Sequence, residues 1–175
     1  ADHYEIGILH KADGAGGSGY MHGLRVRDVL LASPPVNHFP LVADAMHHVL
    51  IAGGIGITPI LSMARTLTGR GMPFDLHYYG RDAGSLAFLD EVGRLPLRGG
   101  YDMFSSDVAK VRADLRKAIV QTAPHRHLYV CGPSGMIGTV LALCDETGWD
   151  ATRVHYEQFS GGVIGNRNQA FTAVL

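Results

Sequence analysis

The sequence predicts an α/β fold with a doubly wound sheet of five parallel strands. Two observations support this prediction. Short apolar runs alternate with amphipathic segments of helical period across residues 45–160, and glycine-rich turns follow several of these runs. Strands that are separated by helices pair in parallel through right-handed crossovers. Ligands bind such sheets beyond the carboxyl ends of the strands, so we expect the functional residues there.

The first strand and helix of this domain occupy residues 47–67. The apolar run at 49–52 is typical of a strand that is covered on both faces. The turn after it contains three glycines, which allow a sharp bend and bring main-chain N–H groups close to a ligand: Gly53, Gly54 and Gly56. We expect Thr58 to cap the following helix and Pro59 to take its first position. Such a helix start favours an anion, most simply a dinucleotide pyrophosphate, but a tight turn without a ligand has the same pattern.

The later elements continue the alternation of apolar runs and helical stripes. Further strands are expected at 74–79, 102–105, 127–131 and 153–156, and further helices at 85–95, 108–122 and 134–144. We assign residues 45–160 to this α/β domain.

Residues 1–44 have a different pattern. Two segments, 4–10 and 24–31, alternate between apolar and polar residues as antiparallel strands do. The loop between them leads into a predicted short helix and is either a flexible hairpin loop or an anion cradle. Its candidate anion-binding residues are Gly16, Gly17 and Ser18. Three prolines within 33–41 exclude regular secondary structure and mark a crossover between domains, which we place near residue 44.

Composition and charge exclude several classes of function. The formal net charge of −1 gives no basic surface for nucleic acid or an anionic membrane. No apolar run approaches the length of a membrane span, and the first residues lack the features of a signal peptide. We therefore expect a cytoplasmic protein with no nucleic-acid or membrane partner. The two cysteines, Cys131 and Cys144, form no C-x-x-C pair, so we expect no metal site within this chain and a packing role for Cys144 in a helix.

The string Gly53-Gly-Ile-Gly-Ile-Thr-Pro59 resembles the start of the nucleotide domain in the ferredoxin–NADP reductase superfamily. The resemblance is strongest to the branch of phthalate dioxygenase reductase and vanillate O-demethylase reductase, and it covers essentially the whole chain, as the middle portion of a longer family member. In that family this turn lies between bound flavin and bound NADH. The resemblance implies that the cofactor-binding residues here include Gly54, Gly56, Ile57, Thr58 and Pro59.

Two further motifs resemble the same family. The sequence Gly16-Gly-Ser18, followed by an aromatic residue and a histidine, is similar to its second flavin-phosphate motif. The sequence Cys131-Gly-Pro-Ser-Gly-Met136 is similar to its C-G-P-x-x-M motif at the nicotinamide. The resemblance implies that four residues of this second motif position the nicotinamide against the flavin, with no need for a nucleophilic thiolate: Cys131, Gly132, Pro133 and Met136.

The ends of two other predicted strands also carry candidates. Asp82 would accept hydrogen bonds from adenosine ribose hydroxyls and repel a 2′-phosphate, although a solvated turn is the alternative. The resemblance gives Arg81 and Asp82 a nucleotide role and favours NADH over NADPH. The segment 155–160 is similar to the family's aromatic and acidic segment over the flavin, so Glu157 and Phe159 are candidates, with Glu157 and Cys131 the two catalytic ones. Tyr156 and Phe159 are also compatible with core positions.

The resemblance implies an NADH-dependent flavoprotein reductase component. NADH would donate a hydride to FMN, and single electrons would pass through a [2Fe–2S] cluster to a partner aromatic-ring oxygenase or O-demethylase. Residues 1–44 would be part of an antiparallel flavin-binding β-barrel. Residues 161–175 would be a linker and the start of a ferredoxin-like domain, whose cluster is expected only in the full-length protein. Two alternatives remain, a reductase that releases free reduced flavin and a non-catalytic nucleotide-binding module.

Overall fold

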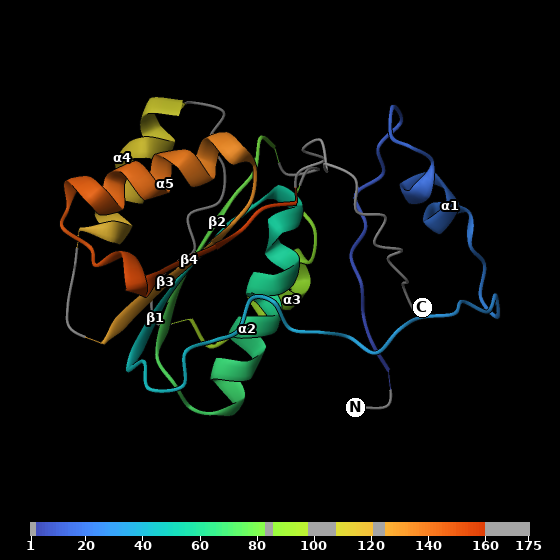
Figure 1. Cartoon of the computed structure of the whole chain (residues 1–175), viewed down its shortest axis with the longest axis horizontal. Helices are drawn as coiled ribbons and strands as arrows, with labels where there is room; N and C mark the ends of the chain where they lie inside the picture. Colours follow the sequence, from blue (N-terminus) through green and yellow to red (C-terminus); the bar gives the residue numbers. More distant parts are fainter. Residues whose placement is uncertain (1–2, 83–85, 98–107, 121–124, 160–175) are drawn as a thin grey trace. The chain divides into compact units, whose positions relative to one another are not determined.

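The computed structural model describes residues 3–82, 86–97, 108–120 and 125–159 (Figure 1). The chain divides into two compact units, with the division between His38 and Phe39, and each unit is described by itself. The predicted strand at 102–105 and the predicted linker at 161–175 lie outside the described residues.

The first unit does not contain the two predicted antiparallel strands. Residues 3–38 form one helix, α1 (Gly17–Gly23), and no strand. The apolar side chains of the 24–31 run stay in solvent, and Val26 is 95% exposed. Two short strands joined by a loop are marginal without a third strand or a helix to cover their apolar face. The strands predicted at 4–10 and 24–31 are therefore wrong.

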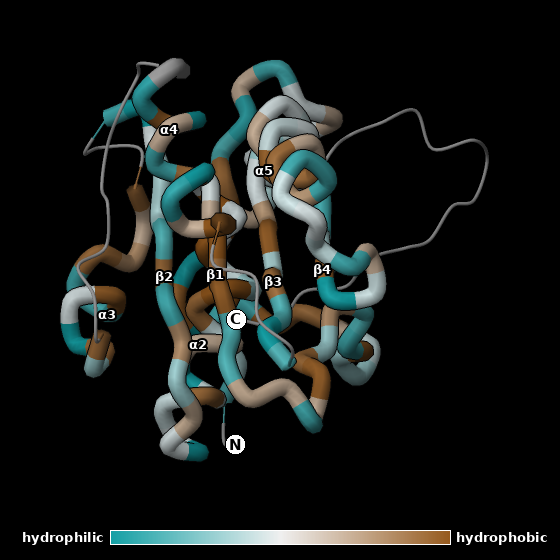
Figure 2. Tube along the Cα trace, turned by 90° about the vertical axis from the view of Figure 1, so that its left-hand side faces the viewer, coloured by the Kyte–Doolittle hydropathy of each residue, from teal (hydrophilic) through white to brown (hydrophobic). Residues whose placement is uncertain are grey.

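The second unit contains a parallel sheet, as the sequence predicts. Its strands are β1 (His47–Gly53), β2 (Phe74–Tyr79), β3 (Arg126–Cys131) and β4 (Val154–Glu157). They pair in the order β2-β1-β3-β4, and Figure 2 shows them side by side. The described sheet thus has four strands rather than five. β1 is central and fully buried on both faces from Val49 to Ala52, as its continuous apolar run predicts.

Helices cover both faces of this sheet, which makes it doubly wound (Figure 1). One face carries α2 (Ile57–Gly69) and α3 (Leu89–Gly93), and the other carries α4 (Val108–Ile119) and α5 (Ser134–Glu146). A 3₁₀ turn, η3 (Ala151–Arg153), precedes β4. The helix predicted at 85–95 is shorter than expected, because Phe88 takes a left-handed conformation (φ 60°) and α3 begins only after it.

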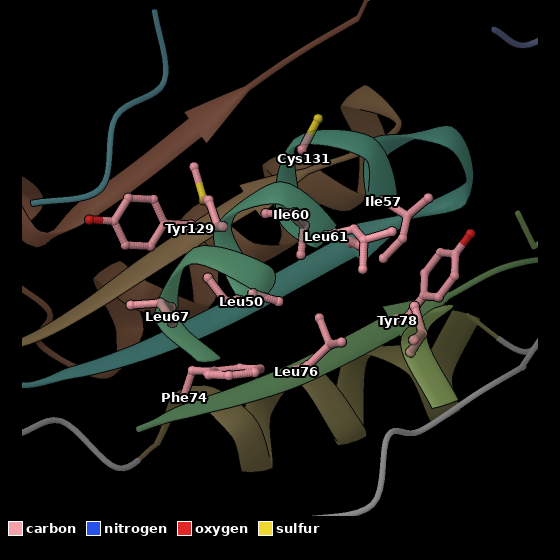
Figure 3. Close-up of a cluster of buried hydrophobic side chains, with 14 of the residues drawn as sticks. Leu50, Ile57, Ile60, Leu61, Leu67, Phe74, Leu76, Tyr78, Tyr129 and Cys131 are labelled. Carbon is pink, nitrogen blue, oxygen red and sulfur yellow. The ribbon is translucent and has the colours of Figure 1, made fainter. Parts of the chain in front are cut away.

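Two apolar clusters hold the helices to the sheet. Figure 3 shows the first, in which residues of α2 such as Ile57 and Leu67 pack on Leu50 of β1 and Tyr129 of β3. The second lies under α4 and α5 and includes Cys144, so the packing role predicted for this cysteine is confirmed. Full burial of one such aliphatic side chain contributes about 1.5–3 kcal/mol. Burial of these clusters therefore stabilises both helical layers on the sheet.

The turn after β1 differs from the prediction in one detail. A 3₁₀ turn, η1 (Gly54–Gly56), follows the strand directly, and α2 begins at Ile57 with Gly56 as its cap residue. Thr58 is therefore not the N-cap, and its hydroxyl instead donates to the Ile55 carbonyl at 3.1 Å. Pro59 occupies the third helical position rather than the first, which is tolerated because amides of a first turn need no helical partner.

Candidate functional site

The candidate site lies at the carboxyl edge of the sheet, between β1 and β3. The chain runs from β1 to β2 on one side and reaches β3 on the other side, so the strand order reverses at this point. In open parallel sheets this reversal opens a crevice that binds ligands. The strand register aligns Ala52 with Cys131 and Cys131 with Glu157. Three predicted segments, far apart in the sequence, therefore end side by side.

The turns after β1 and β3 touch each other through glycine backbones. A Cβ added to Gly56 would overlap the Cys131 carbonyl and lie 2.8 Å from the Gly132 nitrogen. A Cβ on Gly53 would lie 2.8 Å from the Met136 Cε atom, and one on Gly132 would lie 3.1 Å from the Gly53 nitrogen. Gly53 and Gly56 thus leave room for the backbone of the neighbouring turn. The sequence analysis had expected them to leave room for a ligand. Because Gly53 and Gly56 have no side chain, the two turns pack backbone to backbone.

Gly54 has a different role in the same turn. Its backbone is left-handed (φ +53°), a conformation that costs an L residue about 1–2 kcal/mol. A Cβ at this position would meet nothing within 4 Å. Gly54 is therefore the open glycine of the three, needed for its conformation and free to be approached from outside.

Two helices begin at this edge without a side-chain cap. At the start of α2 the Ile57 amide donates to the carbonyls of Gly54 and Ile55. At the start of α5 the Pro133 carbonyl accepts from the Met136 and Ile137 amides at 3.0 and 3.1 Å. The backbone amides just before these hydrogen-bonded amides have no partner within the helix, so a helix start leaves them for a ligand. They also lie at the positive end of the helix dipole. The edge therefore favours an anion.

Cys131, the last residue of β3, is a neutral thiol. Its side chain is fully buried, and burial, with a smaller contribution from the Glu157 charge, raises the pKa of the thiol to about 12. The thiol therefore keeps its proton at neutral pH, whereas a nucleophile would need the thiolate. This property agrees with a positioning role and not with covalent chemistry.

The remaining candidates in this unit lie at or beyond the strand ends. Glu157 is partly buried at the end of β4, and Phe159, just beyond it, is 49% exposed. Tyr156 is 56% exposed, so neither aromatic residue belongs to the core. Arg81 and Asp82 are exposed and follow β2 at the same edge. Ile57 is fully buried among core residues, so only its backbone faces the turn.

The sequence analysis missed Tyr78, which lies one residue before the end of β2. Its ring is fully buried, and its hydroxyl lies 3.1 Å from the Gly54 carbonyl and accepts from the Ala87 amide at 3.0 Å. Burial raises the pKa of this phenol to about 12, so it remains a donor at neutral pH. The alternation of Phe74, Leu76 and Tyr78 was the signal that could have placed this hydroxyl inside the domain.

The flavin-phosphate candidates belong to the first unit. Gly16 caps α1 with a left-handed backbone (φ +92°), and its carbonyl accepts from the Tyr20 amide at 2.8 Å. The Ser18 hydroxyl accepts from the Lys11 amide at 3.1 Å, which closes the glycine-rich loop. A Cβ on Gly17 would meet nothing within 4 Å, so the chain is open there.

Other kinds of site are not found in the described part of the chain. Among residues 3–82, 86–97, 108–120 and 125–159, no three His, Cys, Asp or Glu side chains group closely enough to hold a metal ion. Over the same ranges, no helix combines the length and the apolar content that a membrane crossing requires.

Comparison with known proteins places this geometry in a family. Residues 29–154 match the model of the DmmA-like N-terminal domain, described as the N-terminal domain of a dimethylamine monooxygenase subunit DmmA-like protein. A vanillate O-demethylase oxidoreductase from Acinetobacter baylyi is 37% identical over 172 residues, which are 97% of this chain and 54% of that protein. A carnitine monooxygenase reductase subunit from Escherichia coli is 34% identical over 173 residues, which are 98% of this chain and 53% of that protein.

A solved structure agrees with these sequence relatives. Phthalate dioxygenase reductase, described as a modular structure for electron transfer from pyridine nucleotides to [2Fe–2S], superposes with a TM-score of 0.71 at 35% identity. The match covers 87% of this chain and 48% of that structure, so the chain spans about half the length of the proteins it resembles. The chain belongs to the DmmA-like N-terminal domain family, within the phthalate dioxygenase reductase and vanillate O-demethylase reductase branch of the ferredoxin–NADP reductase superfamily.

Proposed function

We propose that the chain provides the NADH-binding domain and part of the flavin-binding region of an NADH-dependent flavoprotein reductase component. The partner is a terminal oxygenase or O-demethylase that receives the electrons. The observation that carries this proposal is the backbone contact between the two glycine turns at the strand reversal, because it sets two uncapped helix starts around one crevice.

The residues of the crevice fit a dinucleotide. The early amides of η1 and α5 bind the pyrophosphate, and the left-handed Gly54 lets the phosphates approach the backbone. Arg81 and Asp82 bind the adenosine side, where the carboxylate of Asp82 accepts hydrogen bonds from the ribose and disfavours a 2′-phosphate. The cofactor is therefore NADH rather than NADPH.

The floor of the crevice positions the nicotinamide. Gly132 presents no Cβ, and the neutral Cys131 thiol lies beneath the ring without competing for the hydride. Glu157, aligned with Cys131 on the neighbouring strand, supplies a carboxylate beside the reacting rings. Phe159 offers an exposed aromatic face for a second ring system.

The flavin assigned to the protein is FMN, which when bound takes up two electrons together and releases them singly. Gly16 and Gly17 would hold its phosphate through their amides, and Ser18, already bonded to Lys11, would fix the shape of their loop. We assign residues 1–44 to the flavin-binding region, 45–160 to the NADH domain, and 161–175 to a linker toward a [2Fe–2S] domain of the longer protein.

The test is an anaerobic addition of NADH to the FMN-loaded protein, followed at the visible flavin bands. We expect the bands to bleach with NADH and only weakly with NADPH, while the flavin stays with the protein on gel filtration. Bleaching with release of the flavin would indicate a free-flavin reductase instead. Binding of NADH without bleaching would indicate a nucleotide-binding module and overturn the assigned reaction.

A further inference from the structure

The hydroxyl of Tyr78 contacts two backbone segments at the carboxyl edge of the sheet, the turn at Gly54 and the chain at Ala87. Tyr78 pairs with Ala52 in the sheet, so its ring lies beside the last residues of β1. From there the hydroxyl reaches the Gly54 carbonyl at 3.1 Å, and the Ala87 amide donates to it at 3.0 Å. The Ala87 carbonyl lies 3.2 Å from the same oxygen. Figure 3 shows the ring on β2 beside Ile57 and Leu61.

The bond to Gly54 orients the turn that we assign to the pyrophosphate. A peptide plane has its carbonyl and the following amide on opposite sides. Holding the Gly54 carbonyl toward the buried phenol therefore aims the next amide, that of Ile55, away from the core. The Gly54 carbonyl also accepts from the Ile57 amide within the turn, so the phenol reinforces the peptide orientation that this local bond selects.

The bonds to Ala87 act on the adenosine side. The chain from Tyr78 to Ala87 includes both adenosine candidates, Arg81 and Asp82, and the hydroxyl of its first residue bonds the backbone of its last. One buried hydroxyl thus contacts both the pyrophosphate turn, at Gly54, and Ala87, which follows the adenosine candidates along the chain. Burial raises the pKa of this phenol to about 12, so the hydroxyl keeps its proton at neutral pH.

We propose that Tyr78 is a positioning residue for NADH, which sets the Gly54 turn and the Arg81–Asp82 segment for binding without touching the reacting atoms. The inference rests on the proposed function. It predicts that Tyr78 affects the affinity for NADH and not the rate of the hydride-transfer step.

The test compares Tyr78→Phe with Tyr129→Phe in the FMN-loaded protein. Tyr129 is a matched control, because its phenol is also fully buried and its hydroxyl also accepts from one backbone amide, that of Val42 at 2.8 Å. We expect Tyr78→Phe to weaken NADH binding about tenfold, the upper range for one hydrogen bond, with the rate of flavin reduction at saturating NADH changed less than about twofold. Tyr129→Phe should lower the melting temperature but leave the NADH dissociation constant unchanged.

Three results separate the possibilities. If the wild-type protein binds no NADH, the proposed function is wrong, and this inference, which rests on it, is wrong as well. If the wild type binds NADH and the two variants have equal affinities, only the role of Tyr78 fails. If Tyr78→Phe melts below the assay temperature, hydrogen–deuterium exchange of the wild type decides: NADH should slow exchange at the Ala87 amide and leave the Val42 amide unchanged, and equal behaviour of the two amides would overturn the inference.

Discussion

At the amino end of the sheet the polar side chains bind one another, whereas at the carboxyl end glycine backbones make the contact between neighbouring turns. Asp75 accepts from His47 at 2.8 Å and from Arg126 at 2.7 Å, and the rings of His127 and His155 share a 2.9 Å hydrogen bond. The carboxyl end instead has the contact of Gly53 and Gly56 with the β3 turn. Pairs of side chains thus hold the amino end together, and contact between two backbone turns holds the carboxyl end.

The amino end also has a cavity, but its lining does not suit a dinucleotide. Its volume is about 90 Å³, and its walls are mostly apolar side chains of the segment before β1 and of the end of α2. His48, which is 1% exposed, forms part of the wall. This cavity lies at the opposite end of the strands from the proposed nucleotide site.

The largest effect should come from Gly56, where the two turns meet. Gly56→Val would drive a side chain into the Cys131 carbonyl, and we expect the free energy of unfolding to fall by at least about 3 kcal/mol. The control is Gly69→Ala, at the end of α2, where an added Cβ meets nothing within 4 Å. Thermal melting followed by circular dichroism measures both variants. If they melt within about 2 °C of each other, the two turns do not pack as described.

The next effect is a pH dependence of stability that originates at the amino end. Burial lowers the pKa of His48 from 6.5 to about 4, so the unfolded chain binds the proton at higher pH than the folded chain. The resulting stability, up to about 3 kcal/mol, is present above pH 6.5 and is lost as the pH falls toward 4. Urea unfolding at several pH values should show it.

His48→Phe provides the control for that titration, because the adjoining cavity leaves room for the larger ring. Burial also lowers the pKa values of His127 and His155, and these groups remain in the variant. The variant should therefore keep part of the pH dependence but show a shallower slope than the wild type. Parallel curves for the two proteins would mean that His48 does not carry the effect.

A smaller loss is expected when the ion pairs of the amino end are broken. Asp75→Asn removes the charge that faces His47 and the nearly buried Arg126, whose side chain is 11% exposed. Because the Asp75 side chain is 39% exposed, we expect a loss of only about 1 kcal/mol in urea unfolding. Asp114→Asn should lower the free energy of unfolding by less, because the partner of Asp114, Lys117, is 80% exposed. The affinity for NADH should be unchanged in both variants. Weaker NADH binding in Asp75→Asn would contradict the separation of the two ends.

The smallest effect concerns the choice between NADH and NADPH. Asp82→Ala should raise the affinity for NADPH a few-fold, about 1 kcal/mol, because an exposed carboxylate repels a 2′-phosphate only through screened charge. The gain should shrink at high salt. Asp90→Ala, which removes another exposed carboxylate from the first turn of α3, is the matched control. Equal NADPH affinities in the two variants would remove Asp82 from the nucleotide site.

Local pattern was sufficient for the four described strands and the two glycine turns, but contacts between distant segments could not be predicted from it. Burial leaves a pattern of apolar residues in the sequence. The continuous apolar run at 49–52 therefore predicts a buried strand, and the helical spacing of apolar residues in α2 predicts a helix with one buried face. The run at 24–31 leaves a similar trace but forms no strand, since pairing depends on neighbours. That Gly56 meets Cys131 follows only from the register of β1 and β3, and the bond of Tyr78 to Gly54 depends on the same register.

The most direct measurement is an NMR titration of the isotope-labelled protein with NADH, in which each backbone amide reports separately. We expect the largest shift changes at Gly54, Ile55 and Gly56 and at the start of α5, with the amides of His47, His48 and His127 nearly unchanged. That result would assign nucleotide binding to the carboxyl end of the sheet. Changes confined to the amino end, or no saturable change at the two glycine turns, would contradict the proposed site.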